Sequence, residues 1–470
     1  GIIRINKMTV IKVNRPHDQS LIQEVPLMDA QTLENIISKA HRLFLNSEQW
    51  LPAYERIEIL ERAAQIMTEQ IDTLTKIAAQ EGGKPYQDSK VEVLRAVNGV
   101  KLAIEHIAQM KGEQIPMGHT RSSSQRLAFT MREPIGLVAS VSAFNHPLNL
   151  IVHQTVPAIA VGSPVIIKPA KATPLSCFAF MDILKEAGLP DGWCTAFIGE
   201  TELTQKLVTD SRINYFSFIG SAKVGWDLRS KLSPGTRCAL EHGGVAPVIV
   251  EPDADIDEML PALLKGGFYH AGQVCVSVQR VFVHEKICDE VAKRLAAMVK
   301  ELIVGDPLDE KTEVGPLIVP GEVDRVEQWV NEAVEKGAVL LCGGQRLSDF
   351  YYAPTVLLNP PEDTKISNQE VFGPVVCLFS YTDRNTAIKQ ANSLPYAFQA
   401  SVFTNNLNAG LEIVKKLNAT AVIVNDHTAF RVDWMPFGGR DESGIGMGGI
   451  PYSMEEMTRT KMMVIKNKYL

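Results

Sequence analysis

The chain has 470 residues, of which 47 are Lys or Arg and 54 are Asp or Glu, giving a net charge of -7. This acidic balance and the pI of about 5.9 exclude a surface built to bind nucleic acid, which needs clustered positive charge. A hydrophobic content of 45% is typical of a globular protein with a large core, and the length allows roughly three units of about 150 residues.

No segment of the sequence favours a membrane or an export signal. The most apolar stretch, 147–167, is interrupted by His153, Gln154, Gly162 and Ser163. Arg4 and Lys7 precede a broken apolar run, and Met8 is a candidate natural start that would make 1–7 non-native. Seven cysteines without paired metal-ligand spacing predict free thiols, no metal site and a reducing, cytoplasmic location.

Two amphipathic helices are predicted near the N-terminus. Apolar residues recur at three- and four-residue steps over 53–79, and the pattern stops at Gly82, Gly83 and Pro85. A second helix is predicted over 90–109. Arg95 lies off its apolar stripe, so an exposed or ion-paired role is the simpler interpretation of that residue.

Short apolar runs then alternate with helical segments, which predicts an α/β fold with parallel sheets. In the first half the predicted strands are Ile135–Ala143, Pro164–Lys168, Cys194–Ile198, Ile213–Phe218 and Pro247–Val250. A second alternation over 255–425 includes Val278–Val283, a helix to Ile303, Val375–Phe379 and Val422–Val424. We therefore expect two α/β lobes. A doubly wound sheet of this kind commonly binds nucleotides at its strand ends.

Two further segments fit neither lobe. Residues 125–132 alternate between apolar and polar side chains, and 458–466 is another short strand-like stretch. Such strands can pair into a ribbon that a second subunit extends at its edge.

Three polar residues at turns could carry chemistry. Cys275 follows a glycine that allows close backbone approach, but a buried structural thiol is the alternative. Glu241 precedes a diglycine turn and is either an ion-paired group or a tuned base. Asn145 follows a strand, and its amide could cap the next helix or donate to a developing oxyanion.

A phosphate site is also indicated. Gly220 and Gly225 flank a strand-to-helix turn that offers free backbone N–H groups and the positive end of a helix dipole. Lys168 brings a cation to the same edge of the sheet. The spacing is not the GxGxxG fingerprint, so the turn alone indicates little.

Together these pieces resemble the aldehyde dehydrogenase superfamily, over nearly the whole chain. The matching stretches, in family order, are FNHP (144–147), IIKPA (166–170), FIGSAKVG (218–225), LEHGG (240–244), AGQVC (271–275), EVFGP (370–374), PFGG (436–439) and SGIG (443–446). The resemblance implies NAD(P)-dependent oxidation of an aldehyde to a carboxylic acid. Cys275 would be the nucleophile, Asn145 with the Cys275 N–H the oxyanion hole, and Glu241 the base that activates water.

The same resemblance implies the cofactor contacts. They are Phe144, Lys168, Lys171, Gly199, Phe218, Gly220, Ser221, Val224, Glu370 and Phe372. Lys171 stands where many NAD-preferring members carry an acid that binds the ribose 2′-hydroxyl, so NADP is expected to be accepted as well as NAD.

The loop FRVDWMP (430–436) and the segment 454–457 resemble the lactaldehyde and non-phosphorylating glyceraldehyde-3-phosphate dehydrogenase branch. There this loop borders the substrate tunnel, so Arg431 and Arg95 are candidates for contact with a polar or anionic substrate end; two structural ion pairs are the alternative. Val274 stands where members that act on phosphorylated aldehydes often carry Arg, which argues against a phosphosugar.

The resemblance also implies domains and partners. We expect a Rossmann-like cofactor domain (1–115 and 132–243), a second α/β catalytic domain (244–445) and a small β oligomerisation arm (116–131 and 446–470) that joins a homodimer or homotetramer. Met447 and Gly448 replace an Arg-Glu pair of many members, so the tail could dock differently. The alternatives are a CoA-acylating enzyme, which Glu241 argues against, and a catalytically silent binding protein on the same fold.

Overall fold

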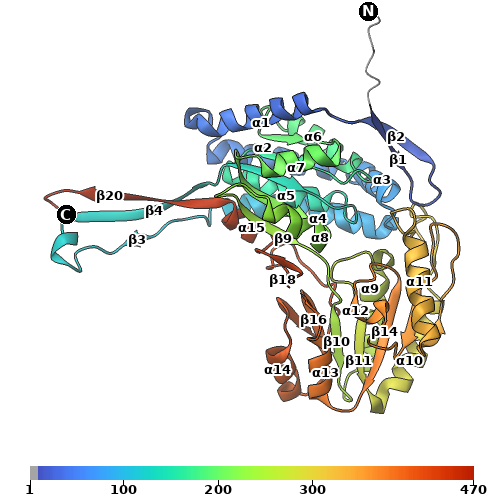
Figure 1. Cartoon of the computed structure of the whole chain (residues 1–470). Coiled ribbons are helices and arrows are strands. Elements are labelled where there is room, and N and C mark those ends of the chain that lie inside the picture. The colour runs from blue at the N-terminus through green and yellow to red at the C-terminus, as the bar shows by residue number, and fades with distance from the viewer. Residues whose placement is uncertain (1–8) are drawn as a thin grey trace, which may run out of the picture.

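The structure is a computed structural model that describes residues 9–470; the candidate start at Met8 and residues 1–7 lie outside the described part. Figure 1 shows two bodies of helices and strands side by side, with a long β ribbon that projects from one of them. In the part of the chain described, no helix is long and apolar enough to cross a membrane.

The first body is built on a six-stranded sheet whose order changes direction in the middle. From edge to edge its strands are β19 (Gly444–Ile445), β9 (Arg237–Glu241), β8 (Ile213–Ile219), β5 (Leu137–Val141), β6 (Val165–Lys168) and β7 (Cys194–Ala196). All pairs are parallel except β19 with β9. This is a doubly wound arrangement, in which ligands bind beyond the carboxyl ends of the strands.

Helices cover both faces of this sheet, which explains the continuous apolarity of its strands. They are α1 (Ala30–Leu45), α2 (Ala53–Glu69), α3 (Ile71–Gly82), α4 (Tyr86–Ile107), α5 (Asn149–Val161), α6 (Leu175–Glu186), α7 (Thr201–Thr209), α8 (Ala222–Ser230) and α15 (Ile450–Glu456). Successive strand residues enter different cores: Val138 packs with α2, α4 and α5, while Leu137 and Ala139 pack with α1. A hairpin of β1 (Val10–Asn14) and β2 (Leu21–Pro26) precedes α1.

The second body holds a seven-stranded sheet around one large apolar core. Its strands, in order, are β12 (Val339–Cys342), β13 (Thr355–Leu358), β14 (Val375–Tyr381), β11 (Arg280–His284), β10 (Pro247–Val250), β16 (Gln399–Phe403) and β17 (Ala421–Val424). The helices are α9 (Ile256–Phe268), α10 (Glu285–Lys300), α11 (Glu322–Glu335), α12 (Lys365–Asn368), α13 (Arg384–Ala391) and α14 (Leu407–Lys416). A small pair, β15 (Tyr396–Ala397) with β18 (Arg440–Asp441), lies beside it.

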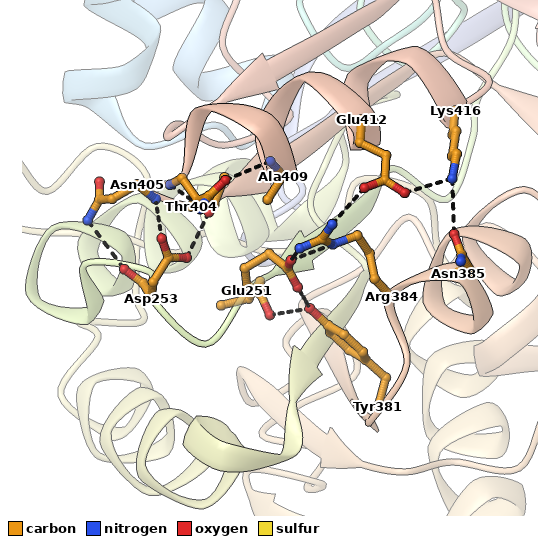
Figure 2. Close-up of polar contacts among 12 residues, drawn as sticks. Glu251, Asp253, Tyr381, Arg384, Asn385, Thr404, Asn405, Ala409, Glu412 and Lys416 are labelled. Carbon is orange, nitrogen blue, oxygen red and sulfur yellow. Dashed lines mark hydrogen bonds and ion pairs between the residues drawn. The ribbon is translucent and has the colours of Figure 1, made fainter.

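A polar network closes the carboxyl ends of β10 and β14 (Figure 2). Glu251, directly after β10, has a buried carboxylate that accepts a hydrogen bond from the Tyr381 hydroxyl and pairs with Arg384 at 2.5 Å. Arg384 also pairs with Glu412, which in turn binds Lys416 at 2.7 Å. Every member has a partner, so the network joins α13 and α14 to the sheet rather than forming an open site.

The ribbon is a three-stranded antiparallel sheet of β20 (Thr458–Lys466), β4 (Arg126–Pro134) and β3 (Gln114–Ile115). All nine residues of β20 pair with β4 although the two strands lie more than 300 residues apart in sequence. The expected pairing of these two segments into a ribbon is therefore confirmed. The chain reaches β20 through α15, whose Ile450 and Met454 are buried in the core of the first body.

The predicted α/β fold with parallel sheets is confirmed, but some element bounds differ. The helix predicted over 53–79 is two helices, α2 and α3, because Gln70 leaves helical geometry (φ -109°, ψ 19°) and its N–H binds the end of α2. The strand predicted from Ile135 begins only at Leu137, since Gly136 has a φ of 125°. The hairpin of β1 and β2 was not predicted from the sequence.

Candidate active site

The candidate residues gather where strand ends of the two sheets meet. Lys168 ends β6, Asn145 follows β5, Gly220 follows β8 and Glu241 ends β9, so all four lie at carboxyl ends of neighbouring strands of the first sheet. Cys275, from the second body, precedes the amino end of β11. Glu370 likewise precedes the amino end of β14, the strand beside β11.

The backbone before Cys275 is held in an unusual conformation. His270 and Ala271 have φ of 51° and 53°, which non-glycine residues rarely adopt, and both are buried. At Gly272, with φ 74°, a Cβ would collide with the Gly373 carbonyl. Only glycine therefore lets the cysteine loop pack against the segment that carries Glu370 and Phe372.

Cys275 packs against a small apolar cluster of Val274, Val276, Phe398 and Phe437. Burial, together with the charges of Glu370 and Glu241, raises the pKa of its thiol to about 12. Arg431 acts in the opposite direction and lowers the pKa of this thiol. The thiol is protonated at neutral pH, and becomes a nucleophile only when a nearby base or positive charge favours the thiolate.

Asn145 is 2% exposed, and its side chain turns toward the cysteine loop. The Asn145 Nδ2 donates to the backbone carbonyl of Gln273 at 3.0 Å, which leaves its second N–H free, while Oδ1 has no partner among the described residues. It does not cap α5, because Glu92 accepts the hydrogen bonds of Leu148 N and Asn149 N there. Of the two roles considered for Asn145, the geometry leaves donation into the site.

Glu241 ends β9 with its carboxylate beside Gly448, where a Cβ would collide with it. Burial raises the pKa of Glu241 to about 7, and the nearby Arg431 charge opposes that shift. A carboxyl with a pKa near 7 exchanges protons at physiological pH, as a general base must. Gly448 leaves the room that this carboxylate occupies, so the departure from Arg-Glu at 447–448 matters for the site.

Two of the expected cofactor contacts meet across the bodies. The rings of Phe144 and Phe372 lie edge to face with centroids 6.1 Å apart. The Glu370 Oε2 accepts from Gly244 N at 2.7 Å, and burial raises the pKa of Glu370 to about 7.

The other contacts lie along the first sheet. Ser221 precedes the first turn of α8, as expected of a phosphate-binding turn, with Phe218 in β8 before it and Val224 in α8 after it. Burial and Lys171 lower the pKa of Lys168 to about 8, and no carboxylate of residues 9–470 lies within ion-pair distance of its ammonium. Gly199 precedes α7. These residues fit a dinucleotide, because they offer cation, backbone N–H and aromatic surface along one edge.

Lys171, expected to favour NADP, has a partner that the sequence did not suggest. Its Nζ lies 3.7 Å from Glu200 Oε2, and both side chains are partly exposed. Glu200 directly precedes α7. The pair therefore places a positive and a negative charge at the position expected for the adenosine ribose. A 2′-phosphate that binds Lys171 there would have to displace or outweigh the Glu200 carboxylate.

The two candidate substrate arginines have different surroundings. Arg95 makes two hydrogen bonds to Asp433, at 3.0 and 3.1 Å, and Asp433 also binds His153 at 2.7 Å. Arg431 makes no ion pair among the described residues: its buried Nε has no partner, and its guanidinium lies 3.6 Å from the centroid of the Phe437 ring. Arg95 therefore forms a structural ion pair, while Arg431 has hydrogen-bond donors available beside Cys275 and Glu241.

Other polar residues at the site were missed by sequence reasoning. Lys84 and Glu92 form a buried pair beside His146, and the Gln273 side chain binds His270 O, Pro316 O and Ile318 N. Gln273 lies within the stretch AGQVC (271–275), but the buried pair of Lys84 and Glu92 has no such motif. The one available signal was a lysine directly after two glycines and before a proline, at 82–85.

The model of the aldehyde dehydrogenase family matches residues 3–463. The 3-sulfolactaldehyde dehydrogenase of Priestia aryabhattai is 38% identical over 413 residues, which are 88% of this chain and 86% of that protein.

Two solved structures have the same fold over nearly the whole chain. Aldehyde dehydrogenase 21 from Physcomitrella patens, in complex with the product succinate, has a TM-score of 0.95 and 34% identity, covering 98% of this chain and 96% of the other. The glyceraldehyde-3-phosphate dehydrogenase GapN from Methanocaldococcus jannaschii, complexed with NADP, has a TM-score of 0.93 and 36% identity, covering 98% and 100%. The resemblance to this branch is confirmed. The chain belongs to the aldehyde dehydrogenase family and is an oxidoreductase that acts on aldehydes.

Proposed function

We propose that the chain oxidises an aldehyde to a carboxylic acid, with NAD or NADP as the hydride acceptor and Cys275 as the nucleophile. The observation that carries the proposal is one arrangement: the Glu241 carboxylate lies close enough to raise the pKa of the Cys275 thiol, and the Asn145 amide is bound to the same cysteine loop. A thiol, a base and a hydrogen-bond donor around one point are what acyl transfer requires.

The residues divide the reaction into two parts. The Cys275 thiol first gives its proton to the Glu241 carboxylate, which passes it on to solvent. The thiolate then adds to the aldehyde carbon, and the resulting oxyanion accepts hydrogen bonds from the free Asn145 N–H and the Cys275 backbone N–H. A bound nicotinamide would accept the hydride that leaves this carbon. Glu241 then takes a proton from water, the water oxygen attacks the thioester carbon, and the acid leaves as the Cys275 sulfur departs.

The cofactor is held, in this proposal, between the first sheet and the segment before β14. Lys168 and Glu370 bind its ribose hydroxyls, the turn at Gly220 and Ser221 binds the pyrophosphate, and Phe144 and Phe372 pack beside the nicotinamide. Support comes from the convergence of these groups and from the NADP bound by the related GapN. The first body would thus be the cofactor domain, and the second the catalytic domain.

For the substrate we propose an aldehyde with an anionic or polar far end. Arg431 supports this, because its buried Nε is unpartnered close to Cys275. The names of the relatives agree in kind: sulfolactaldehyde carries a sulfonate, and succinate a second carboxylate. Val274 still argues against a phosphate.

We also propose that the protein acts in the cytoplasm as a homodimer or homotetramer joined through the ribbon. The odd number of sparsely spaced cysteines supports a reducing compartment, and the exposed apolar side chains of β20 support a partner strand.

Cofactor reduction in the presence of an aldehyde tests the proposal. Wild type should reduce NADP or NAD with butanal or 4-oxobutanoate and release the free acid, and Cys275→Ala should not. Chromatography of the products with and without CoA separates the acylating alternative, because acyl-CoA formation would show that a thiol and not water takes the acyl group. Cofactor binding without any aldehyde-dependent reduction would instead indicate a silent binding protein.

A further inference from the structure

A buried lysine contacts His146, the residue that follows Asn145. Lys84 follows the end of α3, and its side chain is 1% exposed. Its Nζ lies 2.6 Å from Glu92 Oε1 and 2.7 Å from His146 Nδ1. A buried ammonium is costly unless it is paired and hydrogen-bonded, so these two partners are what keeps Lys84 in the interior.

Through these two partners Lys84 is connected to the turn between β5 and α5. Glu92, on α4, uses its second carboxylate oxygen to accept from Leu148 N at 2.8 Å and Asn149 N at 3.1 Å, where α5 begins. The chain therefore leaves β5, passes Asn145, and enters α5 with His146 and the first residues of α5 bound to one buried ion pair. At Gly82 a Cβ would come within 2.8 Å of Pro147, so α3 packs directly against this turn.

The chemistry of the contact orients His146. An ammonium has only donors, so His146 Nδ1 accepts with its lone pair, and the ring is neutral with its proton on Nε2. Burial and the adjacent Lys84 charge hold the pKa of His146 well below its usual value. Tyr269 stacks on the ring at 6.3 Å with an interplanar angle of 17°. The residue adjoining Asn145 is thus fixed from two sides.

Asn145 itself has little to hold it. Its amide makes one hydrogen bond, to Gln273 O, and its oxygen has no partner among the described residues. A buried amide oxygen without a partner costs free energy, so its orientation has to be imposed by the backbone of the turn.

We propose that Lys84 is a positioning residue for Asn145: bound to Glu92, it holds His146 and so aims the Asn145 amide at the reacting oxygen. This inference depends on the proposed role of Asn145 as oxyanion donor. A misplacement of about 1 Å at such a donor costs about a hundredfold in rate.

The test measures steady-state NADPH formation from 4-oxobutanoate. In Lys84→Gln, kcat and kcat/KM should fall together by about 10- to 100-fold, because the interaction acts only in the transition state, while the Kd for NADP measured by fluorescence stays unchanged. In an Asn145→Ala background the same substitution should cost less than about twofold, since the group that it positions is gone.

Glu81→Gln is the matched control. Glu81 lies on α3, is completely buried, and caps α6 through Leu175 N and Ser176 N, as Glu92 caps α5. That variant should lose stability but keep kcat within about twofold. If Lys84→Gln does not fold, His146→Phe decides the matter, because it keeps the stacked ring and the Lys84–Glu92 pair and removes only the acceptor.

Wild-type kcat in His146→Phe and in any folded Lys84→Gln would overturn the inference, as would an equal loss in the Asn145→Ala background. These results are distinct from a failure of the proposed function, in which Cys275→Ala would still reduce the cofactor with aldehyde.

Discussion

At the scale of single residues, the site depends on charges kept close together in a poorly solvated space. Glu241, Glu370 and Arg431 all act on the Cys275 thiol, the two carboxylates raising its pKa and the guanidinium lowering it. Because each group sets the protonation of another, substitution of one should change the chemistry of its neighbours.

Glu241 should set the pH dependence of turnover. A general base acts in its deprotonated form, so with a pKa of about 7 the deacylation rate should rise with pH and level off above about 7. Glu241→Gln should lower steady-state kcat by about 10²–10⁴-fold and leave a burst of NADPH equal to the number of sites. Stopped-flow absorbance checks both; a variant with full steady-state turnover would exclude Glu241 as the base.

The same shift has a consequence for stability. Because the folded-state pKa of Glu241 lies above the ordinary 4.5, its contribution to stability is complete below about 4.5 and is lost as the pH rises through about 7. Glu241→Gln cannot ionise, so it should be at least as stable as wild type at pH 8. This gives a measure of folding independent of the rate.

Arg431→Ala should have two separate effects. Loss of a charge-assisted hydrogen bond to an anionic substrate end should lower kcat/KM for 4-oxobutanoate by about 10- to 100-fold, while butanal, of the same length and uncharged, changes little. Removal of the positive charge should also raise the pKa of Cys275, so alkylation by iodoacetamide should slow at every pH. Equal losses for both aldehydes would remove Arg431 from the substrate site.

Lys171 and Glu200 should set the balance between the two cofactors. Lys171→Glu places a second carboxylate where a 2′-phosphate would bind, so NADP should weaken by at least about tenfold relative to NAD. Glu200→Gln should have the opposite effect, because it frees the Lys171 ammonium for the phosphate. Titration of each cofactor by protein fluorescence gives the Kd values; an unchanged ratio in both variants would contradict the prediction.

At the scale of elements, polar networks join helices to the ends of the sheets. The one in Figure 2 is the clearest: Glu251 is buried after β10, and Arg384, at the start of α13, neutralises it. Removal of one partner from such a pair leaves an uncompensated buried charge.

Arg384→Met should therefore lower the free energy of unfolding of the second body by about 3–5 kcal/mol. Glu412→Gln, which breaks the partly exposed end of the same network, should cost about 1 kcal/mol or less. Urea unfolding followed by circular dichroism compares them. If the two variants cost the same, the buried part of the network does not dominate.

At the scale of the whole molecule, the ribbon is the part that projects away from either core (Figure 1). β20 lies at the edge of its sheet, and four consecutive apolar side chains on it are exposed, Met462, Met463, Val464 and Ile465. An edge strand of this kind is a template for pairing with another chain.

We expect light scattering at micromolar concentration to find at least a dimer. The double variant Met463→Glu with Ile465→Glu should shift the protein toward the monomer. Positions 463 and 465 lie on one face of β20, so two glutamates there would bury unpaired charges in the interface. Lys466→Glu, on the same strand, changes charge without removing apolar area and should remain associated. A monomeric wild type would contradict the assignment of the ribbon.

Much of the fold could be predicted because it follows from local patterns. Strands buried on both faces have continuous apolar runs, so β6, β8 and β10 were predicted nearly to the residue. The break at Gln70 could not be predicted, since the apolar spacing continues across it. The hairpin of β1 and β2 has few buried side chains and therefore gave little signal.

By itself the sequence determined which groups are candidates for the chemistry, because motif order and strand ends follow from the chain alone. They are a thiol at 275, carboxylates at 241 and 370, an amide at 145 and a cation at 168. Only the tertiary structure decided which charge faces which. Arg95 meets Asp433, Lys171 meets Glu200 and Lys84 meets His146 across 338, 29 and 62 positions of the chain. Such pairings depend on how sheets and helices pack, and periodicity within one element carries no information about the side chains of another.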